Sequence, residues 1–480
     1  MVHDYLVGII FYVTWYPVGA DDSIIIPMSN ESQVLLLILG TALCLGGWFQ
    51  WPKEATDFLR PRIVVPAIIF YSVFYQFIRF HWLGGNGGTN IAGIARYRWE
   101  FAGDALEYVT ACLAMFWVGY ILPAGIKICT FLENLSGGAL ISETTLRKWA
   151  VGLALLSLAG GLFFDGLGLF NSLWGYGYMK AVNIHTIGII ITVYRLYGLL
   201  GIAGALILGY TWPPPGKRPA SWPLTVAFLL FCDAAPWMAH FSRGASVFPL
   251  LAVIGYVLRY RRIPWATAAA SLFIFLLGVL TALTGRGIFG HNGGALPYIS
   301  YAWPSFFNLK NLLNATTGTA DSFTPLTVVM AGLHDGNNMG RLTKLNWILF
   351  QLPLPQFMRP KWTFFPAIFI AHEWNANVAS FGYNPGMFGD TFAHWGYGGA
   401  FIFILVGIVY RVVDRLAFSP KTRGQLSLLP LLAPASYFAL LMGCFTNFRA
   451  FNTSMILPFF AVFAYAYFYQ RRPEPFPIDV

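Results

Sequence analysis

Long apolar stretches recur along this chain of 480 residues, and they constrain its fold more than any other feature. Only 10% of the residues are charged, against about 25% in a typical soluble domain. So few charges cannot cover the surface of a soluble particle of this size. The sequence therefore predicts an all-α polytopic membrane protein with a single transmembrane domain over residues 1–480. It argues against a disordered chain, a disulfide scaffold and a nucleic-acid-binding protein.

The apolar stretches can be counted as membrane spans. A helix needs about 20 apolar residues to cross the hydrocarbon core of a bilayer, and about twelve segments meet that measure. The first and the seventh are the weakest, because each contains an Asp and a Pro. The predicted spans centre on residues 4–20, 33–50, 62–82, 104–126, 149–170, 187–210, 221–238, 244–259, 265–285, 396–412, 428–446 and 451–470.

The basic residues give these spans an orientation. If twelve spans alternate, seventeen of the 30 Lys and Arg residues fall on one side with eight of the 20 acidic residues. The positive-inside rule assigns that side to the cytoplasm, so both termini are predicted to be cytoplasmic. The start of the chain has no basic region or small-residue cleavage site, which argues against a removable signal peptide. The five cysteines lie in or beside spans and are expected to be small buried apolar residues.

One long segment separates the ninth predicted span from the tenth. Residues 286–395 fall on the outer side, and a segment of that length is too long for a bare loop. Its apolar runs at 323–333, 345–354 and 362–371 are too short to cross a membrane. We expect this large outer segment to be helical, with helices that lie on the outer membrane surface or dip into it.

Thirteen basic residues remain on the outer side, where the positive-inside rule disfavours them. Arg suits phosphate groups, because its planar guanidinium donates two parallel hydrogen bonds. Together with seven of the eight His residues on the same side, these residues point to an anionic ligand at the membrane. They are Arg79, Arg96, Arg98, Lys180, Arg195, Arg243, Arg286, Lys310, Arg341, Lys344, Arg359, Lys361 and Arg449.

Three of these arginines occupy telling positions near span ends. Arg243 lies where the eighth span begins, and Arg286 lies where the ninth ends. Arg195 is roughly 12 Å below the outer end of the sixth span by helical rise, and a buried ionisable residue there is a functional candidate. Structural alternatives stay open. Arg195 could pair with Asp165 or Asp233, and the other two could reach lipid headgroups.

Candidate acids and bases cluster late in the outer segment. His372 and Glu373 are adjacent, and Asp390 lies just before the tenth span. A carboxylate or imidazole of this kind can take a proton from a sugar hydroxyl. His372-Glu373 lacks a second His four residues on, so it does not match the zinc-binding HExxH motif, and no metal or cofactor is predicted. Hydrogen bonding within the loop explains each of these residues at least as well.

Three stretches in the second half of the chain resemble the Wzy-type bacterial O-antigen and exopolysaccharide repeat-unit polymerases. One is Ser242-Arg243-Gly244, which opens a span ending in the basic residues 259–262. The second is residues 352–361 (LPLPQFMRPK), and the third is residues 389–399 (GDTFAHWGYGG). The N-terminal half matches that family only in hydropathy. The chain has Asp390 where the family often has Glu, and it separates Pro355 from Arg359 where the family has an adjacent Pro-Arg.

The resemblance implies a GT-C-like glycosyltransferase in the bacterial inner membrane, acting on its outer face without a cofactor. A hydroxyl of one polyprenyl-pyrophosphate-linked oligosaccharide would attack the anomeric carbon of another, and polyprenyl pyrophosphate would leave. The implied partners are these lipid-linked oligosaccharides, membrane lipids and a chain-length regulator protein. The base would be His372, Glu373 or Asp390. The pyrophosphate would be held by Arg243, Arg286 and Arg359, with Arg195, Arg341, Lys361 and Arg449 as second choices.

Three alternative functions stay open at this point. An O-antigen ligase has a similar topology and a large late outer loop. A polyprenyl-phosphate-sugar-dependent transferase would use an acidic pair in the first outer loop with a divalent metal, and Asp21-Asp22 is such a pair. A transporter or flippase would also explain twelve spans. It predicts broken helices at matching positions of two repeats, and the sequence shows no such repeat.

Overall fold

The structure is a computed structural model in which helices account for nearly all of the described residues. No strand occurs among these residues, and an isolated antiparallel bridge joins Leu140 to Ser427. The described residues are 29–49, 52–81, 99–136, 140–166, 188–213, 220–239, 243–287, 303–304, 307–308, 322–334, 343–352, 385–418, 426–445 and 447–470.

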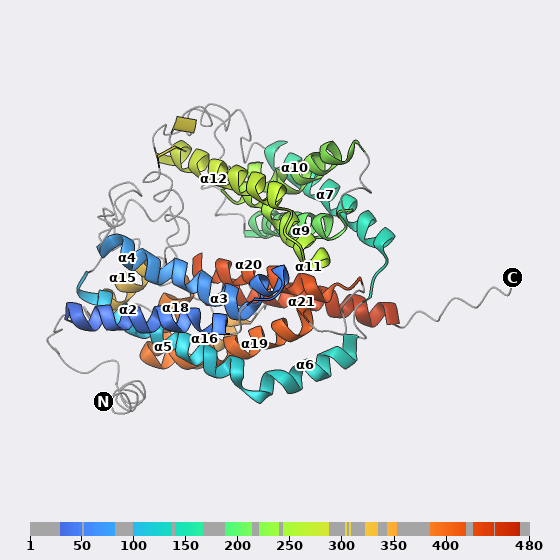
Figure 1. Ribbon diagram of the computed structural model, residues 1–480. Helices are drawn as coiled ribbons and strands as arrows, with labels where there is room; N and C mark the ends of the chain where they lie inside the picture. Colours follow the sequence, from blue (N-terminus) through green and yellow to red (C-terminus); the bar gives the residue numbers. More distant parts are fainter. Residues whose placement is uncertain are drawn as a thin grey trace.

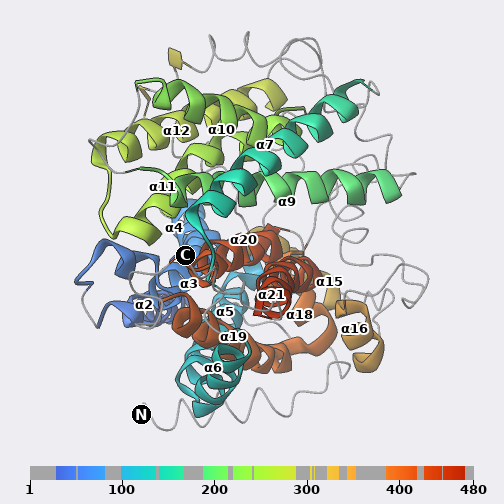
Figure 2. The same ribbon diagram turned by 90° about the vertical axis from the view of Figure 1, so that its right-hand side faces the viewer.

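The helices are arranged in two lobes that pack against each other (Figures 1 and 2). The larger lobe contains α2 (Asn30–Leu45), α3 (Pro61–Ile69), α4 (Tyr75–His81), α5 (Ala102–Ile121), α6 (Pro123–Ser136), α15 (Phe323–His334), α16 (Lys344–Gln351), α18 (Gly386–Trp395), α19 (Ile402–Ala417), α20 (Leu432–Phe445) and α21 (Phe448–Gln470). The smaller lobe contains α7 (Glu143–Gly166), α9 (Gly188–Tyr210), α10 (Trp222–Ala239), α11 (Phe248–Tyr260) and α12 (Trp265–Gly287).

Short elements connect or extend several of these helices. A π-helical turn, η3 (Phe70–Phe74), joins α3 to α4 into one continuous helix. Four-residue and five-residue 3-10 turns, η1 (Gly46–Phe49), η2 (Ala55–Leu59) and η6 (Arg243–Val247), lie after α2, before α3 and before α11. The remaining 3-10 turns are η4 (Trp99–Phe101), η9 (Gly396–Phe401) and η11 (Leu429–Leu431).

The predicted spans can be compared with these helices. The span predicted at 4–20 lies outside the described residues, and each of the other predicted spans coincides with a helix. Among the described residues, four helical segments are long and apolar enough to cross a membrane, or up to five if Ala102–Ile121 and Pro123–Glu133, which are bent by 53°, form one span. The helical, membrane-compatible fold is therefore confirmed, and the number of twelve spans stays a prediction.

Large apolar side chains cover the outside of several helices. Leu35 on α2 is 66% exposed, Leu224 on α10 is 77% exposed, and Phe460 on α21 is 70% exposed. A soluble monomer rarely leaves large apolar patches in contact with water. This surface is compatible with helices that face lipid. By contrast, the five cysteines are all buried and free, as the sequence predicts.

Both lobes have their basic loops and basic helix ends at the same end of the molecule. The basic loop before α3 and the basic ends of α11 and α19 lie at one end of the molecule, which we call the inner end because topology predicts it to be cytoplasmic. The opposite end, where α5 and α21 begin, is called the outer end. Trp149 of α7 packs on Tyr465 near the end of α21, and Trp237 of α10 packs on Phe438 of α20. These contacts join the lobes along their length.

Glycines let the central helices of each lobe approach closely. In the larger lobe, a Cβ atom on Gly119 of α5 would overlap the carbonyl oxygen of Ile404 in α19. A Cβ atom on Gly407 of α19 would in turn overlap the carbonyl oxygen of Phe116. Small residues at such contacts are typical of helices that associate within lipid. In the smaller lobe, α9 and α11 have the same arrangement at Gly209 and Gly255.

The outer segment 286–395 differs in part from the prediction. Residues 323–333 are helical, in α15, but the residues from Phe323 to Gly332 are all buried, in contact with α18 and α5. This helix is apolar on every side, so it packs inside the protein rather than on a membrane surface. Residues 345–351 of the next run are helical, in α16, which ends at Gln351 because the following Leu352 is extended before a proline. The run at 362–371 lies outside the described residues.

A separate helix precedes the tenth predicted span, and the chain turns between the two. Residues 386–395 form α18, a separate helix, and the chain turns at Gly396 with φ 57° and ψ −144°. A residue with a side chain rarely adopts that conformation, and glycine does so readily. The break lets α18 end beside the start of η9 and α19, which places Asp390 inside the larger lobe.

Candidate functional site

Asp390 lies at the centre of a polar group at the outer end. The residue is 2% exposed, and its side chain connects three helices. Its Oδ2 accepts a hydrogen bond from the Phe448 amide at the start of α21, at 3.1 Å. Its Oδ1 accepts a hydrogen bond from Trp347 Nε1 of α16, at 3.3 Å, and also lies 3.3 Å from His394 Nδ1 in its own helix. Asp390 therefore holds α16, α18 and α21 together.

His394 is oriented by its own helix. Its Nδ1 lies 2.9 Å from the carbonyl oxygen of Asp390, which can only accept a hydrogen bond, so Nδ1 carries a hydrogen. The same nitrogen lies next to the Asp390 carboxylate, and the imidazole is fully buried. A carboxylate beside Nδ1 fixes the tautomer and orientation of an imidazole.

Two cationic side chains lie at the starts of helices beside this group. Arg449 is the second residue of α21, and its guanidinium carbon is 4.9 Å from the centre of the Phe350 ring. Lys344 is the first residue of α16, and its Nζ is 5.2 Å from the centre of the Trp395 ring. Helix N-termini are positive ends of the helix dipole, so a cation there costs about 0.3–1 kcal/mol. An anion at the same place would be attracted by both the dipoles and the cations.

Trp347 connects these residues through its ring. The residue is 4% exposed, and its ring centre lies 5.7 Å from that of Trp395, 5.6 Å from that of Phe448 and 6.1 Å from that of His394. Edge-to-face and tilted contacts of this kind add stability beyond the area that they bury. We call Lys344, Trp347, Asp390, His394 and Arg449 the outer cluster.

The outer cluster has a rigid support on its inner side. The hydroxyl of Tyr108 on α5 lies 2.8 Å from Thr391 Oγ1 on α18, and both residues are fully buried. The Tyr108 ring also packs edge-on against Phe392 and Tyr397. These contacts fix α18 against α5, so the position of Asp390 is determined by the core of the larger lobe.

Three of the predicted pyrophosphate-binding residues lie at the outer end of the smaller lobe. Arg243 begins η6, Arg286 lies in the last turn of α12, and Arg195 lies about two turns into α9. Gly278 of α12 packs against Ser246 of η6, which brings the segments bearing Arg243 and Arg286 to the same end. The side chains of the three arginines lie outside the described part of the chain.

The other predicted site residues divide into two groups. Asp390 and Arg449 are brought together, because Asp390 binds the amide of Phe448, the residue just before Arg449. The positions of His372, Glu373, Arg341, Arg359, Lys361 and the alternative pair Asp21-Asp22 lie outside the described residues.

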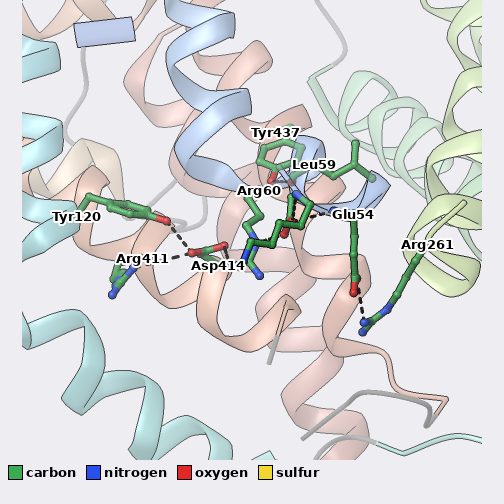
Figure 3. Close-up of polar contacts among 10 residues, drawn as sticks. Glu54, Leu59, Arg60, Tyr120, Arg261, Arg411, Asp414 and Tyr437 are labelled. Carbon is green, nitrogen blue, oxygen red and sulfur yellow. Dashed lines mark hydrogen bonds and ion pairs between the residues drawn. The ribbon is translucent and has the colours of Figure 1, made fainter. Parts of the chain in front are cut away.

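The inner end contains a different polar network, shown in Figure 3. Asp414 on α19 is buried and accepts a hydrogen bond from the Tyr120 hydroxyl at 2.7 Å. Its carboxylate lies between two guanidinium groups, 3.8 Å from Arg60 Nη1 and 3.9 Å from Arg411 Nη1. Arg60 also pairs with Asp57 at 2.9 Å. Each carboxylate of this group therefore faces at least one cation.

Asp57 shows how this network affects ionisation. Burial alone would raise the pKa of its carboxyl group, but the backbone amides of Lys53 and Glu54 donate hydrogen bonds to it. Together with the Arg60 guanidinium, they hold the pKa of Asp57 below its ordinary value of 3.8. The loop before α3 thus stabilises the ionised form of the Asp57 carboxyl group.

The same network extends to the smaller lobe. Glu54 pairs with Arg261 at 3.1 Å, across the boundary between the lobes (Figure 3). Glu143 at the start of α7 binds both Arg259 of α11, at 2.9 Å, and Arg147, at 2.6 Å. Arg261 adopts a left-handed conformation with φ 57°, which ends α11 and turns its side chain toward Glu54. At the inner end, the pair Glu54–Arg261 therefore joins the two lobes, and the other ion pairs lie within one lobe.

Sequence reasoning missed three members of the outer cluster. His394 could have been found from its spacing, because Asp390 and His394 are four residues apart and lie on one face of a helix. Lys344 was one of thirteen outer basic residues, with nothing in its local sequence to single it out. Trp347 carried no signal beyond that of an aromatic residue in an apolar run.

Within the described parts of the chain, no group of three or more His, Cys, Asp or Glu residues is placed to hold a metal ion. The chain was also compared with known proteins. No family model, curated protein or solved structure matches it.

Proposed function

We propose that this protein is a membrane glycosyltransferase that polymerises polyprenyl-pyrophosphate-linked oligosaccharide repeat units on the outer face of the bacterial inner membrane. The observation that carries the proposal is the outer cluster. Lys344 and Arg449 lie at helix N-termini next to a buried carboxylate, at the end where topology disfavours basic residues. Their positions oppose the helix dipoles, so their presence favours a role in binding an anion over a role in stability.

The chemistry of the leaving group fits such a site. In the proposed reaction, the acceptor hydroxyl oxygen forms a bond to the anomeric carbon of the donor. The bond from that carbon to the pyrophosphate oxygen breaks, and its electron pair leaves with polyprenyl pyrophosphate. Preorganised cations stabilise the negative charge that develops on the leaving oxygen. Arg449 would serve in this way, together with Arg243, Arg286 and Arg195 from the smaller lobe and with Arg359, Arg341 and Lys361 from the outer segment.

The hydroxyl proton needs a base, and the geometry of Asp390 suggests a different role for that residue. Its two carboxylate oxygens are engaged by the Phe448 amide, the Trp347 indole and His394. We assign to Asp390 the positioning of α21, and through it of Arg449. The base is then His372 or Glu373, and the alternative that Asp390 itself takes the proton is tested by its variants.

The lipid part of the substrate also has a suitable surface. On α16, Leu345 is 66% exposed, Ile348 is 47% exposed and Leu349 is 37% exposed. These side chains continue from Lys344 along one exposed helix. An apolar surface that begins at a cation suits an amphiphile with an anionic head and a hydrocarbon tail.

The test is the length distribution of the polymer made in cells that express single variants. We expect Arg449→Ala, Arg243→Ala and Arg286→Ala to shift the product from long chains toward single repeat units. Arg262→Ala is the matched control, because Arg262 is an exposed arginine at the inner end, and it should leave the distribution unchanged. Wild-type distributions in all three outer variants, at wild-type protein levels, would contradict the proposal.

The same cells separate the polymerase from its alternatives. Loss of a ligase leaves long polymer that is not attached to its final acceptor, whereas loss of a polymerase leaves single repeat units. Loss of a flippase leaves lipid-linked units on the cytoplasmic face. If the protein is instead a polyprenyl-phosphate-sugar-dependent transferase that uses Asp21-Asp22 with a divalent metal, the variant Asp21-Asp22→Ala should be inactive. Under our proposal that variant retains activity.

A further inference from the structure

A second buried carboxyl group lies far from the outer cluster, within the smaller lobe. Asp233 is on α10, and the residue is fully buried. Neither of its carboxyl oxygens has a hydrogen-bond partner among the described residues, and no charged side chain there interacts with it. This contrasts with Asp390, which accepts hydrogen bonds from the Phe448 amide and Trp347, and with Asp414, which accepts one from Tyr120 and forms ion pairs with two arginines.

The packing around Asp233 leaves little room for water. A Cβ atom on Gly204 of α9 would overlap Asp233 Oδ1, and one on Gly201 would overlap the backbone oxygen of Asp233. The ring of Phe248, at the start of α11, lies against the same Gly201. The carboxyl group therefore lies in the contact between α9 and α10, with α11 closing one side.

A third helix supplies one further polar atom. Ser157 of α7 is fully buried, and its hydroxyl also has no hydrogen-bond partner among the described residues. Ser157 is one turn from Gly161, which packs against Ala235 of α10, and Asp233 is two residues from Ala235. Ser157 therefore lies on the side of α7 that packs against α10, one turn from the contact between Gly161 and Ala235.

Charge and solvation limit what such a carboxyl group can be. An isolated ionised carboxylate in an apolar interior costs far more than a folded protein can offset, so it binds a cation or takes up a proton. Hard cations are held by about six or more oxygen ligands. The side chains described at this junction offer the two oxygens of Asp233 and the hydroxyl of Ser157, and the helix carbonyls are used within the helices. A proton needs only one of these oxygens.

We propose that Asp233 is a proton-binding site in the smaller lobe, whose carboxyl group carries a proton while α7, α9 and α10 are packed together. The proton is released when these helices separate enough to admit water or a base. The proposal does not depend on the function proposed above. It assigns the site to a residue in a predicted span, where ionisable groups are expensive and commonly serve proton or ion movements.

The surroundings of Asp233 determine which other groups could titrate with it. In their outer halves, the elements around Asp233 carry the titratable groups Asp165 of α7, Tyr194, Arg195 and Tyr197 of α9, Cys232 of α10 and Arg243 of η6, of which only Tyr197 and Cys232 have side chains in the described part of the chain. The inner ends of α7, α9 and α11 carry Glu143, Arg147, Lys148, Tyr210, Tyr256, Arg259 and Tyr260, several turns away. Among the described side chains of these outer halves, only Cys232 and Tyr197 could titrate with Asp233, and its proton release should be coupled to helix packing.

The coupling has a structural consequence. Because the carboxyl group contacts Gly204, an ionised carboxylate can gain water only if α9 and α10 move apart. The outer parts of α9, η6 and α12 carry Arg195, Arg243 and Arg286. The proton on Asp233 thus holds in place the helices that carry these three arginines.

The experiment uses the full-length protein in lipid nanodiscs and a hydrophobic carbodiimide, which adds to protonated carboxyl groups. At neutral pH, we expect labelling at Asp233 at least about tenfold faster than at Asp414, an equally buried carboxylate that is bound by cations. Mass spectrometry of peptides identifies the site. The Asp233→Asn variant, which has the shape of the neutral acid, should fold normally and lose that label.

An infrared measurement covers the case in which the reagent cannot reach the site. The carbonyl band of a protonated carboxyl group should be present in the wild type at neutral pH and weaker in Asp233→Asn. The band with or without the label supports the proposal. If the two infrared spectra are the same and Asp233 is not labelled, the proposal is wrong. It is also wrong if sodium ions, replacing choline, abolish both signals, because the ligand is then a cation.

Discussion

The two ends of the molecule use basic residues in different ways. At the inner end, six ion pairs between described residues bind Arg60, Arg147, Arg259, Arg261 and Arg411 to carboxylates. At the outer end, Arg449 and Lys344 lie over aromatic rings at the starts of helices. The first arrangement joins helices and lobes. The second works against the helix dipoles, so we interpret it as preparation for an anionic ligand.

This difference explains why the net charge of +10 says little about function. The predicted topology assigns most of the basic surplus to the inner end, where the positive-inside rule and the ion pairs would account for it. The informative residues are a few cations at the outer end. If the comparison is right, inner variants should lose stability and keep activity, and outer variants should lose activity and keep stability.

The largest effect is expected at Asp414 of the inner network. Asp414→Ala removes a buried carboxylate from Arg60, Arg411 and Tyr120 and leaves partly buried cations without it. We expect the free energy of unfolding in detergent micelles to fall by about 3 kcal/mol. Arg415→Ala, at an exposed position of the same helix, should change it by less than about 0.5 kcal/mol. Equal stability of the two variants would contradict the claim that the ion pairs of the inner end stabilise the protein.

Arg449 provides the matching test at the outer end. Arg449→Ala should lower the rate of glycosyl transfer about 100-fold, measured as release of polyprenyl pyrophosphate. Its free energy of unfolding should stay the same or rise by a few tenths of a kcal/mol, because the arginine opposes the dipole of α21. Arg449→Lys, which keeps the charge but not the planar fork, should recover part of the rate. A variant that unfolds more easily and transfers at the wild-type rate contradicts the anion-binding role.

Glycine substitutions sharpen the comparison within the smaller lobe. Gly204→Ala places a Cβ atom on Asp233 Oδ1, so we expect a loss of about 2 kcal/mol in the free energy of unfolding. Gly152→Ala on α7 is the control, because no atom lies within 4 Å of its Cβ position. That control should be neutral or more stable by up to about 1 kcal/mol. A similar loss in both variants would mean that packing at Gly204 is not the cause.

The smallest effect concerns acid stability at the inner loop. Since the pKa of Asp57 is lowered in the folded protein, its contribution is present above the ordinary value of 3.8 and is lost as the pH falls through the folded value. At neutral pH, the free energy of unfolding of Asp57→Asn should be lower than that of the wild type by less than about 1 kcal/mol, so its melting temperature should also be lower. The two melting temperatures should converge in the acidic range. A constant difference at all pH values would exclude the ionised carboxylate as the cause.

The helices could be predicted from the sequence because they depend on local composition. Apolar segments of the right length mark α2, α7 and α21, and the Asp and Pro in the seventh span did not prevent α10 from forming. The same reasoning failed for α15, because an apolar run reveals that a helix is hidden from water and not whether protein or lipid covers it. The break at Gly396 depends on the backbone conformation of that residue, and the sequence does not indicate which glycine of a glycine-rich stretch adopts it.

The candidate site was predictable only in part. Asp390 and Arg449 are named by the sequence for separate reasons, and their connection through the Phe448 amide is a tertiary contact. The pair Glu54–Arg261 at the inner end is likewise formed by residues distant in sequence. Among the described residues, Asp233 has no polar partner because of how the helices of the smaller lobe pack, and composition does not determine that packing.

The most direct test of the account is a reaction in vitro. Purified protein in lipid vesicles is given lipid-linked repeat units extracted from cells that lack the gene. We predict that the units are joined into chains, with one polyprenyl pyrophosphate released for each new bond, and that Arg449→Ala slows this reaction while Arg262→Ala does not. If no glycosidic bond forms, or if intact units cross the vesicle membrane without being joined, the proposed function is wrong.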